Sequence, residues 1–423
     1  MPIDADKHME PEPSIAEAAS VCFIQSLPTE LLCGIFMMCG APDNLFDYPR
    51  DEVVRCRDGY TDLPMYSRAT VLLSRVCARW FSITRSCPQL WTMVDVPLPQ
   101  FRDVAALKLC LLHSAGLPLT LRINDIHYTP EHRRNADACR QFMRLVASVP
   151  QRWTEISIIV QFAPPNMLDM MQDLIILPRG SFISLRKATL RFIEDEGLPT
   201  VQARLWQMFY SSAALRIVQW HQVFVYAPTN TLQRLTHVGL SPIFPQDLMG
   251  LLKALPAVQV LQATVSRASA DLDIRDGGSL ISVVSTPLVL PHLRVLMLGG
   301  CFVWDWSRFF SGITTPILDR LDLTTTGVQA LAIEEMLSRS DAHLSMLALH
   351  YISRGYEDQI VTLLRCVPLR KLRIMRYCHW QDTYDDIPDI FDPSPFLQTT
   401  TLLSMDTYQD AEDLYRALPA THK

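Results

Sequence analysis

The sequence predicts an α/β protein in which a short N-terminal helical module precedes a solenoid of repeated strand-loop-helix units. Three observations support this prediction. Short leucine-rich segments recur beyond residue 96, helix-like runs alternate with them, and residues 21–96 carry apolar stripes at helical spacing instead. The chain has 423 residues, of which 49% are hydrophobic. It therefore exceeds one ordinary domain core, and it has ample apolar material to bury.

The repeats are clearest in the segment Leu293-x-x-Leu296-x-Leu298-x-x-Cys301-x-Val303, which fits the leucine-rich-repeat template. Looser copies begin at Trp153, Leu185, Leu215, Leu318, Leu344 and Leu369. The last four starts, at positions 293, 318, 344 and 369, lie 25 to 26 residues apart, within the range of this repeat. We therefore expect a leucine-rich-repeat solenoid over residues 97–423. The number of repeats between residues 227 and 290 stays open.

Helix-like runs separate these copies and end at prolines. The runs are Phe142–Val149, Leu248–Leu255 and Ile360–Val367, and a proline follows each of them. Proline has no backbone N–H and stops a helix, which suits a turn into the next strand. Stacked units of this kind form a curved solenoid with parallel strands on the inside.

Alternation along each strand predicts which side chains line the inner surface, because the template leucines point into the core. The predicted row is Thr189, Arg191, Gln219, His221, Met297, Asp322, Thr324, Ala348, His350, Arg373 and Met375. Charges of both signs, amides and hydroxyls favour a protein or peptide ligand over a phosphate-binding groove. The candidate substrate-binding residues in this row are Arg191, His221, Asp322, His350 and Arg373.

Aromatic residues cluster just after several strands. They are Phe302, Trp304 and Trp306 in one repeat, Tyr351 in another, and Tyr377, His379 and Trp380 in a third. Equivalent positions of successive repeats stack on one rim, so these side chains are candidate anchors for a substrate. The candidates are Trp304, Trp306, Tyr351, Tyr377 and Trp380, and core filling beneath loops is the alternative interpretation.

The N-terminal module begins with a helix that starts at Pro28 and ends by Gly40. Residues 41–67 lack periodicity and predict an irregular insertion. A second helix runs from Ala69 to the proline at position 88, and residues 90–96 predict a short helical turn that leads into a strand. Residues 1–20 are polar and acidic, and we expect a disordered tail there.

Three separated segments of this module resemble an F-box: Leu27-Pro28-x-Glu30-Leu31-Leu32-x-x-Ile35-Phe36, Ser74-x-Val76-Cys77-x-x-Trp80, and Leu90-Trp91. The insertion between the first two is longer than the family's usual linker. The resemblance implies that residues 21–96 bind a Skp-family adaptor of an SCF-type, cullin-based ubiquitin ligase. The implied adaptor-binding residues are Leu27, Pro28, Leu31, Leu32, Ile35, Val76, Trp80, Leu90 and Trp91. A purely local core is the alternative for these side chains.

Composition narrows the class of protein further. The net charge of −6 gives no general attraction for nucleic acid or anionic membranes. The N-terminus does not read as a signal peptide, and no apolar run has the length of a membrane span. The eleven scattered cysteines suit reduced thiols, so we expect a cytoplasmic or nuclear protein.

The sequence contains no G-x-S-x-G, G-x-x-x-x-G-K-[ST], H-E-x-x-H or G-x-G-x-x-G motif. We therefore expect no enzymatic activity, no cofactor and no metal. The expected function is that of a substrate receptor, in which the F-box binds the adaptor and the repeats bind a protein substrate. The alternatives are a leucine-rich-repeat scaffold, whose end helices only cap the stack, and an F-box protein without a role in ubiquitin transfer.

Overall fold

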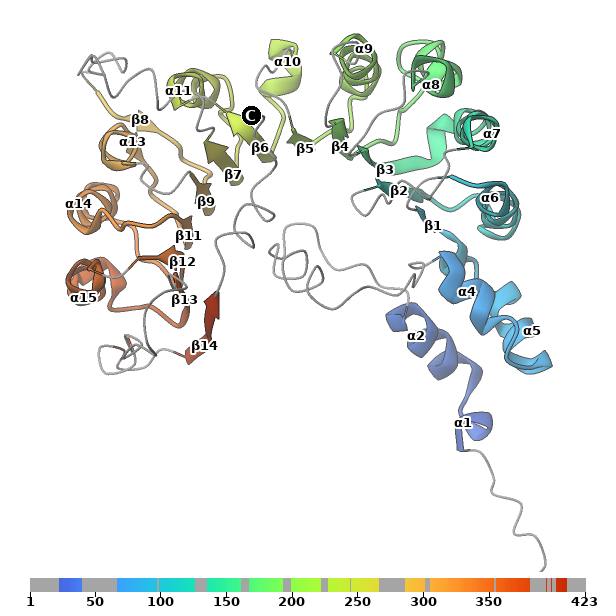
Figure 1. Cartoon of the computed structure of the whole chain (residues 1–423), viewed down its shortest axis with the longest axis horizontal. Coiled ribbons are helices and arrows are strands. Elements are labelled where there is room, and N and C mark those ends of the chain that lie inside the picture. The colour runs from blue at the N-terminus through green and yellow to red at the C-terminus, as the bar shows by residue number, and fades with distance from the viewer. Residues whose placement is uncertain are drawn as a thin grey trace, which may run out of the picture.

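The computed structural model describes residues 23–39, 67–96, 99–125, 135–160, 167–192, 199–221, 227–243, 245–265, 286–300, 305–353, 355–380, 393, 397 and 401–408 (Figure 1). Twelve strands form one sheet, and every neighbouring pair is parallel. In spatial order they are β1 (Met93–Val96), β2 (Leu119–Asp125), β3 (Trp153–Val160), β4 (Lys187–Phe192), β5 (Ile217–Trp220), β6 (His237–Ile243), β7 (Val260–Val265), β9 (Val295–Gly299), β11 (Arg320–Thr324), β12 (Met346–Ile352), β13 (Ile374–Trp380) and β14 (Thr401–Tyr408). A separate parallel pair joins β8 (Leu288–Val289) to β10 (Ile313–Thr314).

Helices line the outer side of the curved sheet, and the strands line its inner side (Figure 1). The outer helices are α6 (Phe101–His113), α7 (Ala136–Ala147), α8 (Met167–Ile175), α9 (Pro199–Tyr210), α10 (Thr229–Leu232), α11 (Pro245–Lys253), α13 (Ser307–Ser311), α14 (Ala330–Ser340) and α15 (Glu357–Arg365). The helical module at the N-terminal end contains α1 (Phe23–Ser26), α2 (Thr29–Cys39), α4 (Ser67–Leu73) and α5 (Ala78–Ser86). Short 3-10 turns are η1 (Pro88–Trp91), η2 (Pro150–Arg152) and η4 (Val367–Leu369).

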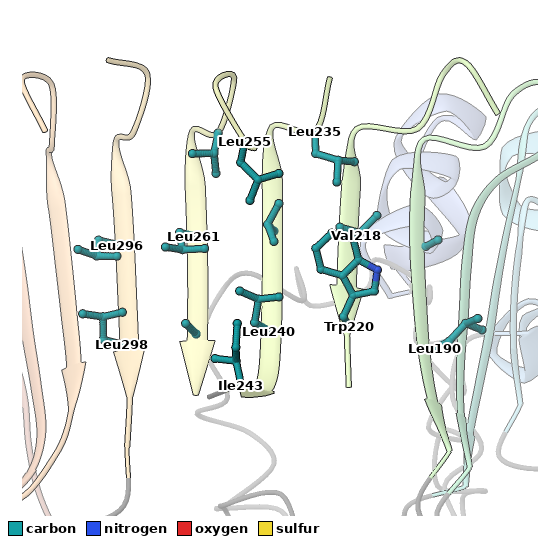
Figure 2. Packing of buried hydrophobic residues seen from close by; sticks show 14 of the residues in the cluster. Leu190, Val218, Trp220, Leu235, Leu240, Ile243, Leu255, Leu261, Leu296 and Leu298 are labelled. Carbon is teal, nitrogen blue, oxygen red and sulfur yellow. The ribbon is translucent and has the colours of Figure 1, made fainter. Parts of the chain in front are cut away.

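The core lies between the sheet and the outer helices. Two rows of buried side chains run across the strands in register, and Figure 2 shows the middle of both rows. The first row is Leu121, Ile156, Ala188, Val218, Val238, Leu261, Leu296, Leu321, Leu347 and Met375. The second row, two residues further along each strand, is Ile123, Ile158, Leu190, Trp220, Leu240, Ala263, Leu298, Leu323, Leu349 and Tyr377. Each of these ten strands therefore contributes the same two core-facing positions.

The structure confirms the predicted α/β class and the alternation of strands and helices, an arrangement compatible with a solenoid. Helices α7, α11 and α15 end shortly before the prolines at positions 150, 256 and 368. The stretch whose repeat number stayed open contributes β6 and β7 to the sheet. None of the helices among the described residues has both the length and the apolar character that a membrane crossing requires.

The last predicted repeat was wrong in register. The strand corresponding to those of the preceding units begins its pattern at Leu372 rather than Leu369, so Met375 and Tyr377 are the core residues. A shift by three residues, an odd number, exchanges the two faces of a strand. Met375 is consequently buried instead of lining the inner surface, and Arg376 takes the inner position. Arg373 precedes β13 and is exposed.

The single second helix predicted for the module was also wrong, because α4 and α5 are separate helices. The N–H groups of Arg75 and Val76 bond back to Leu72 and Leu73 at 2.9 and 3.3 Å, which closes α4. Cys77 is extended, with φ of −159° and ψ of 168°, and α5 begins after it. The short turn and strand predicted at residues 90–96 are confirmed as η1 and β1. The expected tail (1–20) and residues 41–66 of the expected insertion lie outside the described residues.

Two tryptophans fix the connections between helix and strand in the same way. The indole N–H of Trp153 donates to the Val146 carbonyl at 2.9 Å, and that of Trp91 donates to the Thr84 carbonyl at 2.7 Å. Each bond spans seven residues. The bond from Trp91 holds η1 against α5 within the module. The Trp91 ring also lies 4.9 Å from the His113 ring of α6 between centroids, so the module packs onto the first repeat unit as a preceding unit does.

Replacing Leu321 by Ala should lower the free energy of unfolding by about 3 kcal/mol, because its side chain is completely buried between the sheet and the helices. Leu331→Ala is the matched control, since Leu331 in α14 is 69% exposed; its effect should stay within about 0.5 kcal/mol. Urea unfolding monitored by circular dichroism measures both. Equal losses in the two variants would contradict the assignment of the core rows.

Candidate binding surfaces

The buried side chains of the helical module form the N-terminal end of the core that continues through the repeats. Leu32 and Phe36 of α2 are buried with Ile83 and Trp91, and the Phe36 and Trp80 rings lie 4.7 Å apart between centroids. The Thr70 hydroxyl, also buried, donates to the Leu90 carbonyl at 2.9 Å. Helix α2 packs on α4 and α5, so the inward positions of all three helices are occupied.

The same helices, and the turn between α4 and α5, carry apolar side chains that face away from this core. Among the described residues, sixteen large hydrophobic side chains are at least 40% exposed. Six of them belong to the module, although the module is much shorter than the repeat region. We call them the exposed module residues: Leu31, Met37, Met38, Leu72, Val76 and Phe81. A helix such as α2 that is apolar on both sides needs a second surface to cover it. The module therefore has the character of a docking element.

The structure divides the implied adaptor-binding residues into three groups. Leu31, Val76 and Pro28 are exposed, whereas Leu27, Ile35 and Trp80 are half-buried. Leu32, Leu90 and Trp91 are buried in the module core, so they support the surface from below and do not form it.

Four exposed module residues escaped the prediction: Met37, Met38, Leu72 and Phe81. Met38 follows Leu31 by seven residues, so both lie on one side of α2. This spacing could have predicted from the sequence that Met38 belongs to the same surface.

The second candidate surface is the inner face of the sheet. At its N-terminal end it carries a group of charges on neighbouring strands. Glu155 of β3 pairs through the same carboxylate oxygen with Arg122 of β2 at 3.2 Å and with Lys187 of β4 at 3.1 Å. Asp95 of β1 lies in register with Arg122. All four side chains are largely covered, so their interactions are less screened than those of surface pairs.

Burial shifts the ionisation of this group. Desolvation raises the pKa of Asp95 to about 6, the Arg122 charge opposes the shift, and Glu155 adds to it. Desolvation lowers the pKa of Lys187, while its ion pair with Glu155 opposes that change. Both shifts have the same cause, because burial disfavours the charged form of each side chain.

The middle of the inner face is apolar at the start of the strands. Ile217, Val260, Val295, Met346 and Ile374 are half-buried positions of one register row. His237 and Arg320 interrupt this row.

Gly239 occupies the next inner position on β6. A Cβ there would meet the Gln219 side chain at 3.0 Å, so the close packing of neighbouring strands favours glycine.

Towards the C-terminal end, Arg320 holds Asp322 by three hydrogen bonds: Nε donates to Oδ1 at 3.2 Å and to Oδ2 at 3.0 Å, and Nη2 donates to Oδ2 at 2.6 Å. Asp322 is only 1% exposed. Burial raises its pKa, and the bonds and charge of Arg320 oppose that rise. The opposite charges of Arg320 and Asp322 compensate each other on the inner face. The Asp322 carboxylate is therefore not free to accept hydrogen bonds from a ligand.

The remaining predicted substrate contacts fall into different environments. Arg191 and His221 lie on the inner face close enough to interact electrostatically, and His350 lies on it as well. Trp306 and Tyr377 are 1% exposed, and the Trp306 ring contacts the Phe309 ring at a centroid distance of 5.6 Å.

The predicted aromatic rim was thus wrong for Trp306 and Tyr377, which fill the core. Tyr351 is also buried, at a β-bulge where its φ is 64°. Trp304 and the side chain of Trp380 lie outside what the structure describes.

The charged group on β1–β4, which consists of Asp95, Arg122, Glu155 and Lys187, was not predicted from the sequence. The copy starting at Trp153 already implied that Glu155 lies on the inner face, but β2 fits the repeat template poorly and gave no register. Within the described ranges, no three His, Cys, Asp or Glu side chains come together as a metal site. No protein-family model matches the chain. No curated protein matches it at a significant level.

Asp95→Asn should make the protein more stable relative to wild type as pH rises. The raised pKa means that folding favours the protonated carboxyl, so its contribution is fully present below about pH 4 and is lost as pH rises through about 6. The gain from Asp95→Asn should grow from near zero at pH 4 to about 3 kcal/mol at pH 8. Urea unfolding of both proteins across this range is the measurement, and a difference that does not vary with pH would contradict it.

Proposed function

We propose that this protein is the substrate receptor of an SCF-type ubiquitin ligase. In this proposal, residues 21–96 act as an F-box that binds a Skp-family adaptor, and residues 97–423 form a leucine-rich-repeat solenoid that binds a protein substrate. The observation that carries the proposal is the set of exposed module residues on helices whose sequence resembles an F-box. The protein catalyses nothing itself, and it raises the concentration of a substrate near the ubiquitin-loaded enzyme.

The exposed module residues support adaptor binding because the module does not need them for its own packing. Leu32 and Phe36 fill the inner side of α2, whereas Leu31 is 56% exposed one residue away. Across the module, Val76 is 59% exposed. When a partner covers such side chains, the burial of apolar surface stabilises the complex by about 25 cal/mol per Å². Central apolar anchors of this kind carry much of the affinity of an interface.

The inner face supports the substrate half of the proposal. Its covered ion pairs, apolar row and hydroxyl groups resemble the mixed composition of protein interfaces. A continuous row of cations would instead indicate nucleic acid.

A second candidate function is a scaffold in which the N-terminal helices only cap the repeat stack. The contact between the Trp91 ring and the His113 ring of α6 favours it, because it attaches the module to the first repeat unit as a capping unit would be attached. Co-purification of the adaptor separates the two: a receptor retains it and a scaffold does not. An F-box protein without a role in ubiquitin transfer would retain the adaptor but would not raise ubiquitination of any bound protein.

Leu31→Ala combined with Val76→Ala should weaken binding of the Skp-family adaptor by roughly a thousandfold, if each anchor contributes about 2 kcal/mol. Because both side chains are exposed, the thermal unfolding temperature should hardly change. Calorimetry on the full chain gives the affinity, and scanning calorimetry gives the unfolding temperature.

The matched control is Leu109→Ala combined with Leu112→Ala, which removes two exposed leucines from α6, outside the F-box-like segments. It should leave adaptor affinity unchanged. Wild-type affinity in the folded Leu31 and Val76 double variant would refute the docking assignment.

Affinity purification under proteasome inhibition should recover the adaptor, the cullin and ubiquitinated proteins with the wild-type chain. The Leu31 and Val76 double variant should lose the adaptor and the cullin but keep the bound substrates, because its sheet is intact. Mass spectrometry compares the two samples. Recovery of the cullin with both proteins would contradict the proposed function.

A further inference from the structure

Hydrogen-bonding groups without partners gather on the inner face over β2–β5. Arg122 Nε, Thr189 Oγ1 and both ring nitrogens of His221 are buried and make no hydrogen bond to the protein. A buried polar group without a partner is destabilising by about 1–3 kcal/mol, so a group of them calls for an explanation. These residues are a guanidinium, a hydroxyl and an imidazole, each of which can donate a hydrogen bond.

The strand register brings these groups together. Arg122, Ser157, Thr189 and Gln219 occupy one row on β2, β3, β4 and β5. Arg122 and Thr189 are two strands apart, about 10 Å, and the residue between them has only the short Ser157 side chain. His221 directly follows β5 and lies near Arg191, whose charge adds to burial in lowering the pKa of His221 to about 3.

Three cations lie close to the same site, and the carboxylate of Glu155 partly neutralises two of them. Arg122 and Lys187 share one oxygen of Glu155, and Arg191 lies beside His221. A carboxylate or phosphate bound there would accept hydrogen bonds from the partnerless groups and would interact favourably with these cations.

We propose that the inner face over β2–β5 binds an acidic group, a carboxylate or a phosphate, carried by an extended peptide of a protein partner. This inference rests on the substrate half of the proposed function and specifies the chemistry of that substrate. The half-buried row that begins at Ile217 and continues through Val260 and Val295 lies next to the site and suits apolar residues of the same peptide. That row and the net charge of −6 favour a peptide over a nucleic acid.

The test uses the full chain and four fluorescent probes in anisotropy titrations. Three are peptides of identical apolar sequence that carry a central glutamate pair, phosphoserine pair or lysine pair, and the fourth is a short single-stranded RNA. We expect micromolar binding of the glutamate or phosphoserine peptide, and their order identifies carboxylate or phosphate as the preferred source. Equal binding of the lysine peptide, tighter binding of the RNA, or no binding of either acidic peptide would overturn the proposal.

Thr189→Val and His221→Phe probe the site without removing a hydrogen bond within the protein. Each should weaken binding of the acidic peptide about tenfold. Each should also keep or raise the unfolding temperature, because it replaces buried polar atoms that have no partner. Arg191→Gln should weaken binding as well, whereas Arg204→Gln, an exposed arginine on the outer helix α9, should not.

Unchanged peptide affinity in Thr189→Val, His221→Phe and Arg191→Gln would overturn the site even if the wild-type chain binds the peptide elsewhere. Adaptor affinity measured on the same variants should equal that of wild type. If the acidic peptide does not bind but the adaptor does, the peptide site is refuted and the receptor proposal is not. Failure of the wild-type chain to bind the adaptor would refute the receptor proposal while leaving the peptide site to its own test.

Discussion

The whole structure depends on the parallel ladder that links each strand to the units before and after it. The Arg216 N–H bonds to the Arg186 carbonyl at 3.0 Å, and the Thr236 N–H bonds to the Arg216 carbonyl at 2.8 Å. The strand partners and the apolar neighbours of a unit both come from adjacent units, so no unit is complete by itself. The stack must therefore be closed at its ends, and at the N-terminal end the helical module is joined to it through the contact of Trp91 with His113 of α6.

This construction leaves two surfaces with different physical chemistry. The buried rows consume the apolar side chains of the strands, so the inner face is left with charges, hydroxyls and one partly apolar row. The module contributes only a few side chains to the core, and apolar side chains remain outside it on three helices and in the turn between α4 and α5. One surface suits apolar docking and the other suits recognition of polar groups. Because different elements build them, each surface can be altered by mutation without direct damage to the other.

The strength of the local pattern determined how well each part was predicted. The copies starting at Leu293, Leu318 and Leu344 gave the core-facing positions correctly, because the repeated leucines fix the register. The final copy offered leucines at both 369 and 372, and the less regular pair Met375 and Tyr377 completes the true pattern. The aromatic residues were harder to assign, because sequence spacing does not say whether a ring after a strand lies above or beneath its loop.

By itself the sequence determined the α/β class, the alternation of strand and helix, and the apolar character of α2, since each follows from periodicity within a few residues. Tertiary structure alone decided that Leu32 is covered and Leu31 is not, because that depends on where α4 and α5 pack. It also decided that Arg122, Glu155 and Lys187 meet, although 33 and 32 residues separate them in sequence. Local periodicity specifies that a side chain faces one side, whereas its neighbours there come from distant parts of the chain that only the folded stack brings together.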